Sequence, residues 1–240
     1  MRAIPTLMFI FVGAYDFNSV IADDEIILED FAAPSHTWRQ LNDPVMGGVS
    51  TGTFTLTPDG LAVLAGVVSD VPSLGAPGFI YAGSVDSVRF PDVSACTAMS
   101  ITARSVIPYA GYRICFGRSH PIDAKFFAYG HKADFNLPAG GEFSTVEIPF
   151  TNFSDLWDDA TGDAIRTCQE DKRHCPDRDN LANLAPISIW AEGVSGKVRL
   201  EIKQLAASGC AGAPIADEIS AAYDVNTRAG IARMLWDNFS

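Results

Sequence analysis

The side chains that could act as acids, bases or nucleophiles are scattered along this chain, and no catalytic motif joins them. The metal-binding motif His-Glu-x-x-His does not occur, and no glycine-rich phosphate loop connects a strand to a helix. Asp43 and Glu201 could supply the two carboxylates of a glycoside hydrolase only if folding brought them to the required separation. We therefore expect a non-enzymatic protein whose histidines are surface or packing residues. These are His36, His120, His131 and His174.

The densest group of oxygen ligands lies in the loop 152–163. Calcium is a hard cation that prefers carboxylate oxygens, so the loop is a candidate structural calcium site. It is not an EF-hand, because its glycine and the distal glutamate are misplaced. The alternative is a solvated acidic loop with Trp157 packed beneath it, and no other cofactor is expected. The candidate ligands are Asp155, Asp158, Asp159 and Asp163.

Three tryptophans offer a second kind of binding chemistry. The faces of aromatic rings stack on the apolar faces of sugars, so Trp38, Trp157 and Trp190 could line a carbohydrate platform. Large aromatic side chains are also common in cores, where an indole N–H seeks an acceptor. Both interpretations remain open from the sequence alone.

The run between Cys168 and Cys175 is polar, Gln-Glu-Asp-Lys-Arg-His, and we expect a disulfide to close it. The loop-entropy relation gives such a short closure roughly 2–3 kcal/mol of stabilisation. A zinc site formed by Cys168, His174 and Cys175 is the alternative, but its spacing fits no usual ligand pattern.

The other cysteines allow a second disulfide. Cys96 and Cys115 could join neighbouring strands, which would leave Cys210 buried, free or bridged to another chain. Disulfides form in oxidising compartments, so the two predicted pairs imply that the protein resides in such a compartment.

The first residues predict that compartment. Arg2, an apolar run from Ile4 to Tyr15 and small residues at the end predict a signal peptide over residues 1–22. A mitochondrial leader would be rich in arginine, so a mitochondrial address is the weaker alternative, as is a plastid route that begins with a signal peptide. Asn152 and Asn238 begin glycosylation sequons. We expect secretion or an endomembrane lumen.

The net charge of -12 narrows the class of partner. Nucleic acid and anionic membrane surfaces are both bound through lysine and arginine, so this chain is a poor match for either. The apolar leader is too short to span a membrane. A protein partner, or a carbohydrate, fits the composition better.

Short alternating segments separated by glycine and proline turns predict an all-β antiparallel sandwich, covering residues 23–207. Residues 208–214 read as a linker, and apolar residues at helical spacing beyond it predict a short helical C-terminal tail through residue 240. The predicted strands are 26–31, 52–56, 61–68, 79–81, 87–90, 98–104, 112–117, 126–129, 133–137, 145–150, 187–191 and 197–205.

One stretch, residues 38–54, combines a large anchor, a turn and the start of a strand. Pro44 fixes its own φ, and the Gly-Gly pair that follows allows backbone angles or close approaches closed to other residues. The stretch is either a rigid turn between strands or a loop that presents Asn42, Asp43 and Met46 to a partner.

The run Trp-x-x-x-Asn-Asp-Pro-Val-Met-Gly-Gly-Val-Ser-x-Gly-x-Phe resembles the signature of the complex I intermediate-associated protein 30 family. Gly78-Phe79-Ile80 and residues 196–205 resemble further family segments, so the likeness spans residues 26–207. The family has an arginine soon after its Gly-Phe segment, and Arg89 is only a loose counterpart of it here. The insertion between Cys168 and Cys175 also departs from the family pattern. The resemblance implies a galactose-binding-like jelly-roll sandwich. The partner-binding residues it suggests are Trp38, Asn42, Asp43, Met46, Gly47, Gly48 and Ser50.

Known members of this family act as assembly factors of respiratory complex I, so the resemblance implies an assembly-factor or chaperone-like binding protein. The predicted leader places that role in the secretory or endomembrane pathway. A carbohydrate-binding module is the alternative, because related sandwiches bind sugars through loops at one end. A mitochondrial complex I assembly factor is the second alternative.

Overall fold

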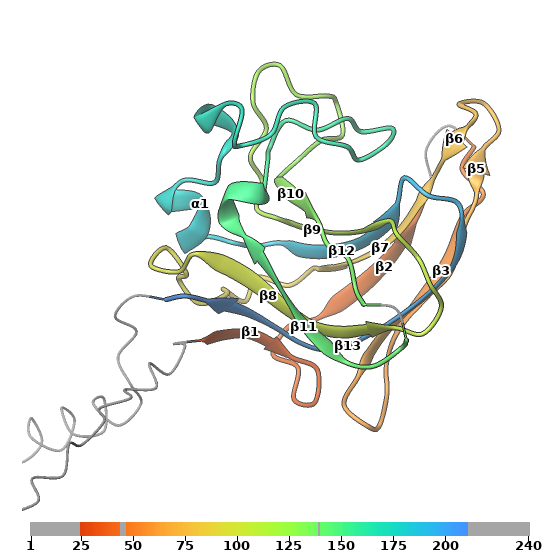
Figure 1. Cartoon of the computed structure of the whole chain (residues 1–240), viewed down its shortest axis with the longest axis horizontal. Helices are drawn as coiled ribbons and strands as arrows, with labels where there is room; N and C mark the ends of the chain where they lie inside the picture. Colours follow the sequence, from red (N-terminus) through yellow and green to blue (C-terminus); the bar gives the residue numbers. More distant parts are fainter. Residues whose placement is uncertain (1–24, 44–46, 139, 211–240) are drawn as a thin grey trace, which may run out of the picture.

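The computed structural model describes residues 25–43, 47–138 and 140–210, which form two packed antiparallel β-sheets (Figure 1). This confirms the predicted all-β jelly-roll sandwich. The strands are β1 (Ile26–Asp30), β2 (Trp38–Asn42), β3 (Thr51–Leu56), β4 (Ala62–Val68), β5 (Asp70–Val71), β6 (Ala76–Pro77), β7 (Phe79–Ser84), β8 (Ala98–Ser105), β9 (Tyr112–Phe116), β10 (His131–Asp134), β11 (Ser144–Pro149), β12 (Ile187–Glu192) and β13 (Gly196–Ser208).

The six-stranded sheet is organised around its longest strand, β13. The strand order is β11-β8-β13-β4-β3, and β1 pairs with the last part of β13. The first part of β13 pairs with β4 over residues 196–202, and β1 takes the same edge over residues 204–207. A register shift between Ile202 and Gln204 marks the change of partner along β13.

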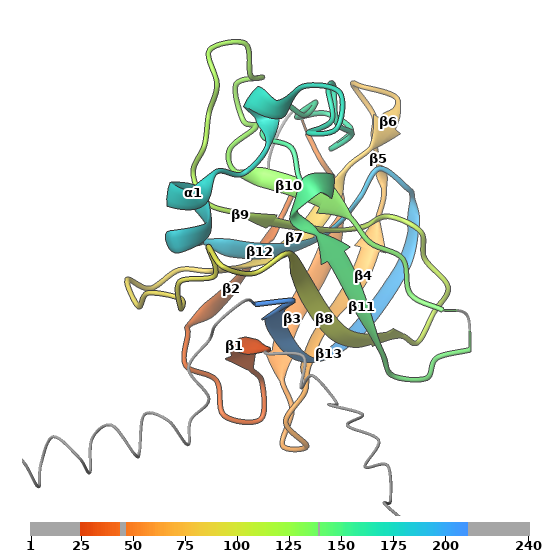
Figure 2. The same cartoon turned by 60° about the vertical axis from the view of Figure 1, so that its left-hand side comes forward.

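The five-stranded sheet has the order β10-β9-β12-β7-β2 and packs against the first sheet (Figure 2). Side chains alternate between its two faces, as they must along a pleated strand. On β12, Ile187, Ile189 and Ala191 are fully buried between the sheets, whereas Trp190 faces the other side. This outer face is the one that the rest of the chain covers only in part.

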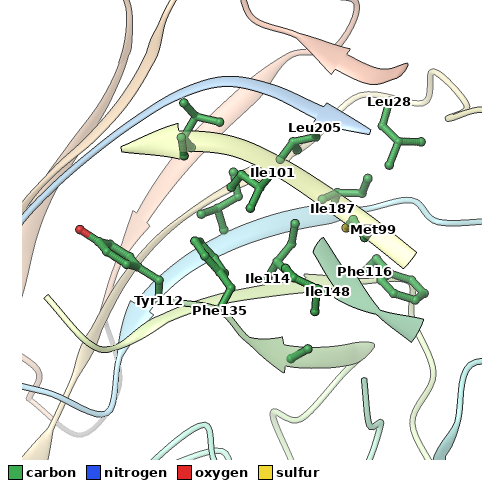
Figure 3. Packing of buried hydrophobic residues seen from close by; sticks show 14 of the residues in the cluster. Leu28, Met99, Ile101, Tyr112, Ile114, Phe116, Phe135, Ile148, Ile187 and Leu205 are labelled. Carbon is green, nitrogen blue, oxygen red and sulfur yellow. The ribbon is translucent and has the colours of Figure 1, made fainter. Parts of the chain in front are cut away.

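Aliphatic and aromatic side chains from both sheets fill the space between them (Figure 3). Met99 and Ile101 from β8 meet Ile114 and Phe116 from β9, and all four are fully buried. Each such side chain contributes about 1.5–3 kcal/mol through removal from water. The alternating pattern read from the sequence therefore forms one continuous core.

Two segments rise from the outer face of the five-stranded sheet, on the side away from the six-stranded sheet (Figure 1). They are residues 117–130, between β9 and β10, and residues 150–185, which contain the short helices η1 (Phe150–Asn152), η2 (Lys172–His174) and α1 (Arg178–Ala182). The small β5–β6 hairpin stands at one end of the same sheet.

Some predicted strands were wrong. Residues 87–90 and 126–129 are loops, and the strand expected over 133–137 is β10, which begins two residues earlier. Residues 126 and 127 are both phenylalanine, a residue favoured in strands, but their side chains are exposed and no neighbouring strand pairs with them. Strand β2 was not predicted, because its five residues are too few to establish alternation; its first residue, Trp38, was interpreted as an anchor that precedes a turn.

The predicted signal peptide and the predicted helical tail lie outside the described residues, as do Met46 and Asn238. Within the described ranges, no helix is long and apolar enough to cross a membrane.

Candidate functional site

The outer face of the five-stranded sheet carries a row of side chains contributed by successive strands. The register places Leu41 of β2 beside Tyr81 of β7, Tyr81 beside Trp190 of β12, and Trp190 beside Arg113 of β9. The next row, nearer the other end of the strands, contains Arg39, Gly83, Ser188, Cys115 and Lys132. The pairing of these strands, together with the alternation within each, brings residues distant in sequence onto one surface.

Two cavities of about 470 Å³ and 520 Å³ adjoin one another over this face. They form one continuous groove, since five residues line both. The shared residues are Leu41, Tyr81, Phe127, Trp157 and Trp190. The sheet forms the floor, residues 117–130 and 157–160 form one wall, and the β5–β6 hairpin closes one end.

Aromatic rings dominate the middle of the groove. Tyr81 and Trp190 stack with centroids 4.2 Å apart, and Phe79 lies 5.1 Å from Trp190. Trp157 approaches Trp190 edge-on at 6.4 Å, and its N–H donates to the Gly130 carbonyl oxygen. Tyr81, Trp190 and Phe79 are half-buried, so they present apolar area to a ligand, whereas Trp157 is buried and mainly supports Trp190.

A buried charge network lies beside these rings. The Lys132 ammonium is 2.7 Å from Glu192 Oε1 and lies over the rings of Trp157 and Trp190, 3.5 Å and 4.0 Å from their centroids. Arg113 Nη1 is 3.5 Å from the same Glu192 oxygen. Burial alone would lower the pKa of Arg113, but Glu192 and neighbouring aspartates raise it, so the guanidinium stays charged. The network holds both indoles in place.

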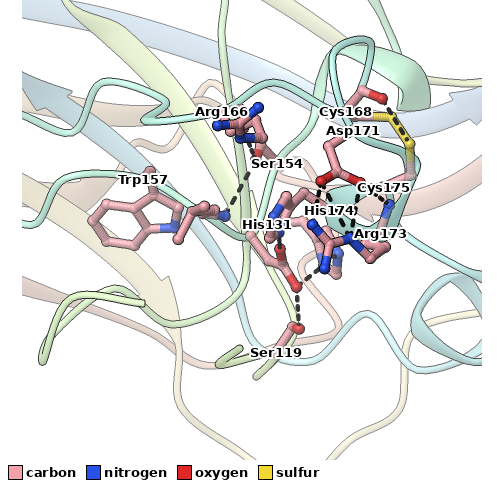
Figure 4. A network of polar contacts seen from close by, with 12 residues as sticks. Ser119, His131, Ser154, Trp157, Arg166, Cys168, Asp171, Arg173, His174 and Cys175 are labelled. Carbon is pink, nitrogen blue, oxygen red and sulfur yellow. Dashed lines mark hydrogen bonds and ion pairs between the residues drawn. A yellow bond between two sulfur atoms is a disulfide. The ribbon is translucent and has the colours of Figure 1, made fainter. Parts of the chain in front are cut away.

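A second buried cluster joins the two segments that form the groove wall (Figure 4). Asp155 accepts hydrogen bonds from the Ser119 hydroxyl at 2.6 Å and from His174 Nδ1 at 2.8 Å. His131 Nε2 lies 3.8 Å from the same carboxylate. Burial lowers the pKa of His131, although Asp155 opposes that shift, so the imidazole stays neutral at neutral pH. These contacts tie residues 119, 155 and 174 together and so position Trp157.

The four aspartates proposed as calcium ligands are not brought together. Asp155 belongs to the histidine cluster, Asp158 caps its own loop through the Thr161 N–H, and Asp159 accepts from the Phe127 N–H. Asp163 pairs with Arg113. Across residues 25–43, 47–138 and 140–210, no group of three or more His, Cys, Asp or Glu side chains is arranged to hold a metal ion.

Asp43 and Glu201, considered as a hydrolytic pair, lie on different sheets. Asp43 follows β2 and borders the groove, whereas Glu201 on β13 is paired with Arg104 and Arg199. The fold therefore does not assemble this pair of carboxylates into a catalytic site.

Trp38, the first residue of the signature stretch, anchors the sheets rather than lining the groove. Its ring packs against Phe31 and Phe54, with centroids 5.4 Å and 5.9 Å away, and its N–H donates to Glu29 Oε2 at 2.8 Å. The Glu29 carboxylate is buried and also contacts His36 Nδ1 at 3.0 Å. Of the three tryptophans considered for a sugar platform, the structure brings together Trp157 and Trp190 only.

Asp43, in the middle of the signature stretch, is buried at one end of the groove. A Cβ added to Gly48 would lie 2.4 Å from the Asp43 side chain, and one added to Gly78 would lie 2.4 Å from Asp43 Oδ2. Ser50 is buried and hydrogen-bonds to the backbone of Ser69. Asn42 donates to the Gly52 carbonyl oxygen at 3.3 Å, and Gly47 has φ +80°. Close packing therefore surrounds Asp43, and Ser50 is held by the backbone of Ser69.

We expect Gly78→Ala to lower the free energy of unfolding by about 1–3 kcal/mol, the usual cost of overpacking, because its methyl group would collide with Asp43. Urea denaturation followed by tryptophan fluorescence measures the change. Gly83→Ala in β7 is the matched control, since its Cβ would meet its neighbours at an ordinary 3.4 Å. Equal stability of the two variants would contradict the packing role assigned to Asp43.

The cysteine pairing differs in part from the prediction. The Cys168–Cys175 disulfide is confirmed, and the zinc alternative is wrong because the two sulfurs are bonded to each other. Cys96 pairs with Cys210, so the predicted Cys96–Cys115 bond is wrong. Cys96 belongs to the core, whereas Cys115 alternates with core residues of β9 and faces the groove. Burial raises the pKa of the Cys115 thiol to about 12.

A family model described as complex I intermediate-associated protein 30 matches residues 29–163, more than half of the chain. This chain belongs to that family. The match begins at Glu29, the acceptor for Trp38, and ends at Asp163, a partner of Arg113. It covers the signature stretch, but the closing strand β13 lies beyond it. A comparison with curated proteins found no match.

Two of the solved structures similar to this family member are carbohydrate-binding modules. A family 11 module from Clostridium thermocellum, solved in complex with a β-1,3-1,4-mixed-linked tetrasaccharide, is 15% identical with a TM-score of 0.50. The alignment covers 78% of this chain and 96% of the module. The family 11 module of a cellulosomal cellulase from the same organism is 15% identical, with a TM-score of 0.49 and coverages of 78% and 95%. At this identity the likeness shows the fold.

Several groove residues of this family member escaped the sequence analysis. No sequence motif contains Tyr81, Lys132 or Glu192. Each lies on a short strand, where an outward-facing polar or aromatic residue looks like any other surface residue. The available signal was alternation: Phe79 and Tyr81 flank the buried Ile80, as Trp190 is flanked by Ile189 and Ala191. Reading outward aromatics across several strands at once would have indicated this face.

Proposed function

We propose that this family member is a non-catalytic binding protein and that its groove holds a carbohydrate chain. The observation that carries the proposal is the half-buried aromatic surface of Phe79, Tyr81 and Trp190 along the groove floor. Such rings bury the apolar faces of sugars, while nearby polar groups orient the hydroxyls. The tetrasaccharide complex of the similarly folded family 11 module is a precedent for glycan binding on this architecture.

The shape of the groove favours an extended ligand. Its two cavities share five lining residues and run over successive strands from β2 to β12. A single sugar would occupy only part of this length, so an oligosaccharide or polysaccharide chain is the better match.

The chemistry of the lining supports binding without catalysis. The Cys115 thiol stays protonated at neutral pH, because burial raises its pKa to about 12. The Glu192 carboxylate is held by Lys132, and no histidine is among the described residues that line either cavity. A hydrolase would need a carboxylate pair poised on both sides of a glycosidic bond. Two of the carboxylates that line the groove are instead held by the protein, Asp159 by the Phe127 N–H and Glu192 by Lys132.

We further propose an extracellular or lumenal location. Two disulfides within the described residues fit an oxidising compartment, and Asn152 of the first sequon is exposed. The expected signal peptide over residues 1–22 agrees with this location. Glycans are abundant partners in such compartments.

A protein partner is the second candidate, in line with the assembly-factor role of the family. It is favoured by the segment 117–130, where Ile122 is fully exposed and Phe126 and Phe127 are 75% and 55% exposed. Exposed apolar side chains gathered on one loop often mark a protein-binding surface. Phe127 lines the groove, whereas Ile122 and Phe126 do not, so variants can separate the two functions.

Glycan-array binding, followed by calorimetry on the bound species, tests the proposal with the full chain, its disulfides formed. We expect Tyr81→Ala and Trp190→Ala each to weaken glycan binding about tenfold or more, as truncation of a central aromatic contact does. Phe126→Ala is the matched aromatic control and should leave glycan affinity unchanged. No bound glycan, or binding that persists in both groove variants, would refute the proposal. A partner protein lost only in Ile122→Ser and Phe126→Ala would favour the second candidate.

A further inference from the structure

Charge divides the groove into two unlike halves. The half that contains Arg39 and Arg118 has no carboxylate among its described lining residues. The half beneath the β5–β6 hairpin contains Asp43, Asp159 and Glu192 and no cation among its described lining residues. The charged side chains that line the groove are thus separated by sign along its length.

The two arginines in the first half are not used by the fold. Within the part of the chain that the structure describes, neither Arg39 nor Arg118 forms an ion pair or a side-chain hydrogen bond, and both are exposed. Arg113, close by on the same face, is instead saturated by Glu192, Asp134 and Asp163. The free guanidinium groups therefore lie where a ligand can reach them.

The two arginines come from different elements that line the same half of the groove. Arg39 on β2 pairs with Gly83, which has no side chain, and the row continues through Ser188 and Cys115. Arg118 follows Gly117, whose φ of +78° turns the chain out of β9 and into the groove wall. One guanidinium thus comes from a floor strand and the other from the wall formed by residues 117–130.

From these observations we infer that the ligand is an anionic glycan, with its carboxylate or sulfate ester held in the Arg39–Arg118 half. A guanidinium donates two parallel hydrogen bonds to either oxyanion, and charge-assisted bonds of this kind are about twice as strong as neutral ones. The net charge of -12 repels anions from the molecule as a whole, so this local pair supplies the selectivity. The inference rests on the proposed carbohydrate function and names its ligand class.

The test uses the full chain, its disulfides formed, on an array that pairs each anionic glycan with a neutral form. Oligogalacturonate with its methyl ester reports carboxylate recognition, and a sulfated galactan with its desulfated form reports sulfate recognition. We expect one anionic form to bind about tenfold more tightly than its neutral partner, and the preference to shrink as salt is raised.

Arg39→Gln and Arg118→Gln should each lower affinity for the anionic form about tenfold and leave affinity for the neutral form unchanged. Lys125→Gln is the matched control, because Lys125 is an exposed cation of the same wall segment that does not line the groove. Equal binding of charged and neutral forms, unaffected by either arginine variant, would overturn this inference and leave the carbohydrate function standing. Absence of binding to every glycan would overturn both.

Discussion

Glu192→Gln is expected to lower the free energy of unfolding by about 3–5 kcal/mol, because it leaves the Lys132 ammonium buried without its counter-charge. Lys132 and Glu192 are 4% and 5% exposed, and Nζ and Oε1 are 2.7 Å apart. Water cannot replace the missing carboxylate at such a site. The Arg113 guanidinium keeps Asp134 and Asp163, so the cost arises mainly at Lys132. Urea denaturation at neutral pH measures the effect.

Two further variants isolate the cause. Lys132→Met combined with Glu192→Gln should recover much of the lost stability, because the uncompensated charge is then gone and a side chain of similar length fills its place. Arg173→Gln removes a partner from an ion pair in which the arginine is 83% exposed, and should have little effect. If Glu192→Gln changes stability no more than Arg173→Gln does, the network is not a stabilising element.

Loss of the Cys96–Cys210 disulfide in the double variant Cys96→Ala/Cys210→Ala is expected to cost about 2–5 kcal/mol. The bond connects residues 114 positions apart, so it removes much freedom from the unfolded chain. It joins the segment before β8 to the end of β13, two strands that pair along most of their length. Alanine is used because both sites are buried in the core cluster. Chemical denaturation without reductant measures the effect.

The second disulfide provides the comparison. Cys168 and Cys175 are separated by 7 positions, so the entropy relation predicts a smaller loss of about 2–3 kcal/mol for their replacement. Peptide mapping under non-reducing conditions tests the pairing directly. A peptide that joins Cys96 to Cys115, or an unchanged stability after loss of Cys96 and Cys210, would contradict the assignment.

Local sequence patterns were sufficient for the sandwich. Alternation of period two depends only on the pleat of each strand, so it is visible within a few residues. The sequence left Trp38 open between a sugar platform and a core position, and the structure packs it on Phe31 and Phe54 with its N–H donating to Glu29. The Cys168–Cys175 closure was also predictable, because a short loop brings its two ends together without help from distant segments.

The groove depended on contacts that no local pattern records. The apposition of Tyr81, Lys132 and Trp190 follows from the strand order β10-β9-β12-β7, which joins segments far apart in the chain. The acidic loop looked like a cation site in the sequence, but its carboxylates bind different partners, Ser119, Phe127 and Arg113. Partner choice among carboxylates is decided by three-dimensional proximity, which composition does not encode.

The sequence by itself determined the fold class and the family of this protein, because the first depends on short-range alternation and the second on a contiguous motif. Only the tertiary structure decided which face carries the groove, which cysteine is left unpaired, and which charges are buried in pairs. These features arise when a sheet of fixed register brings side chains from separate strands within a few ångströms, and register is a property of the whole sheet.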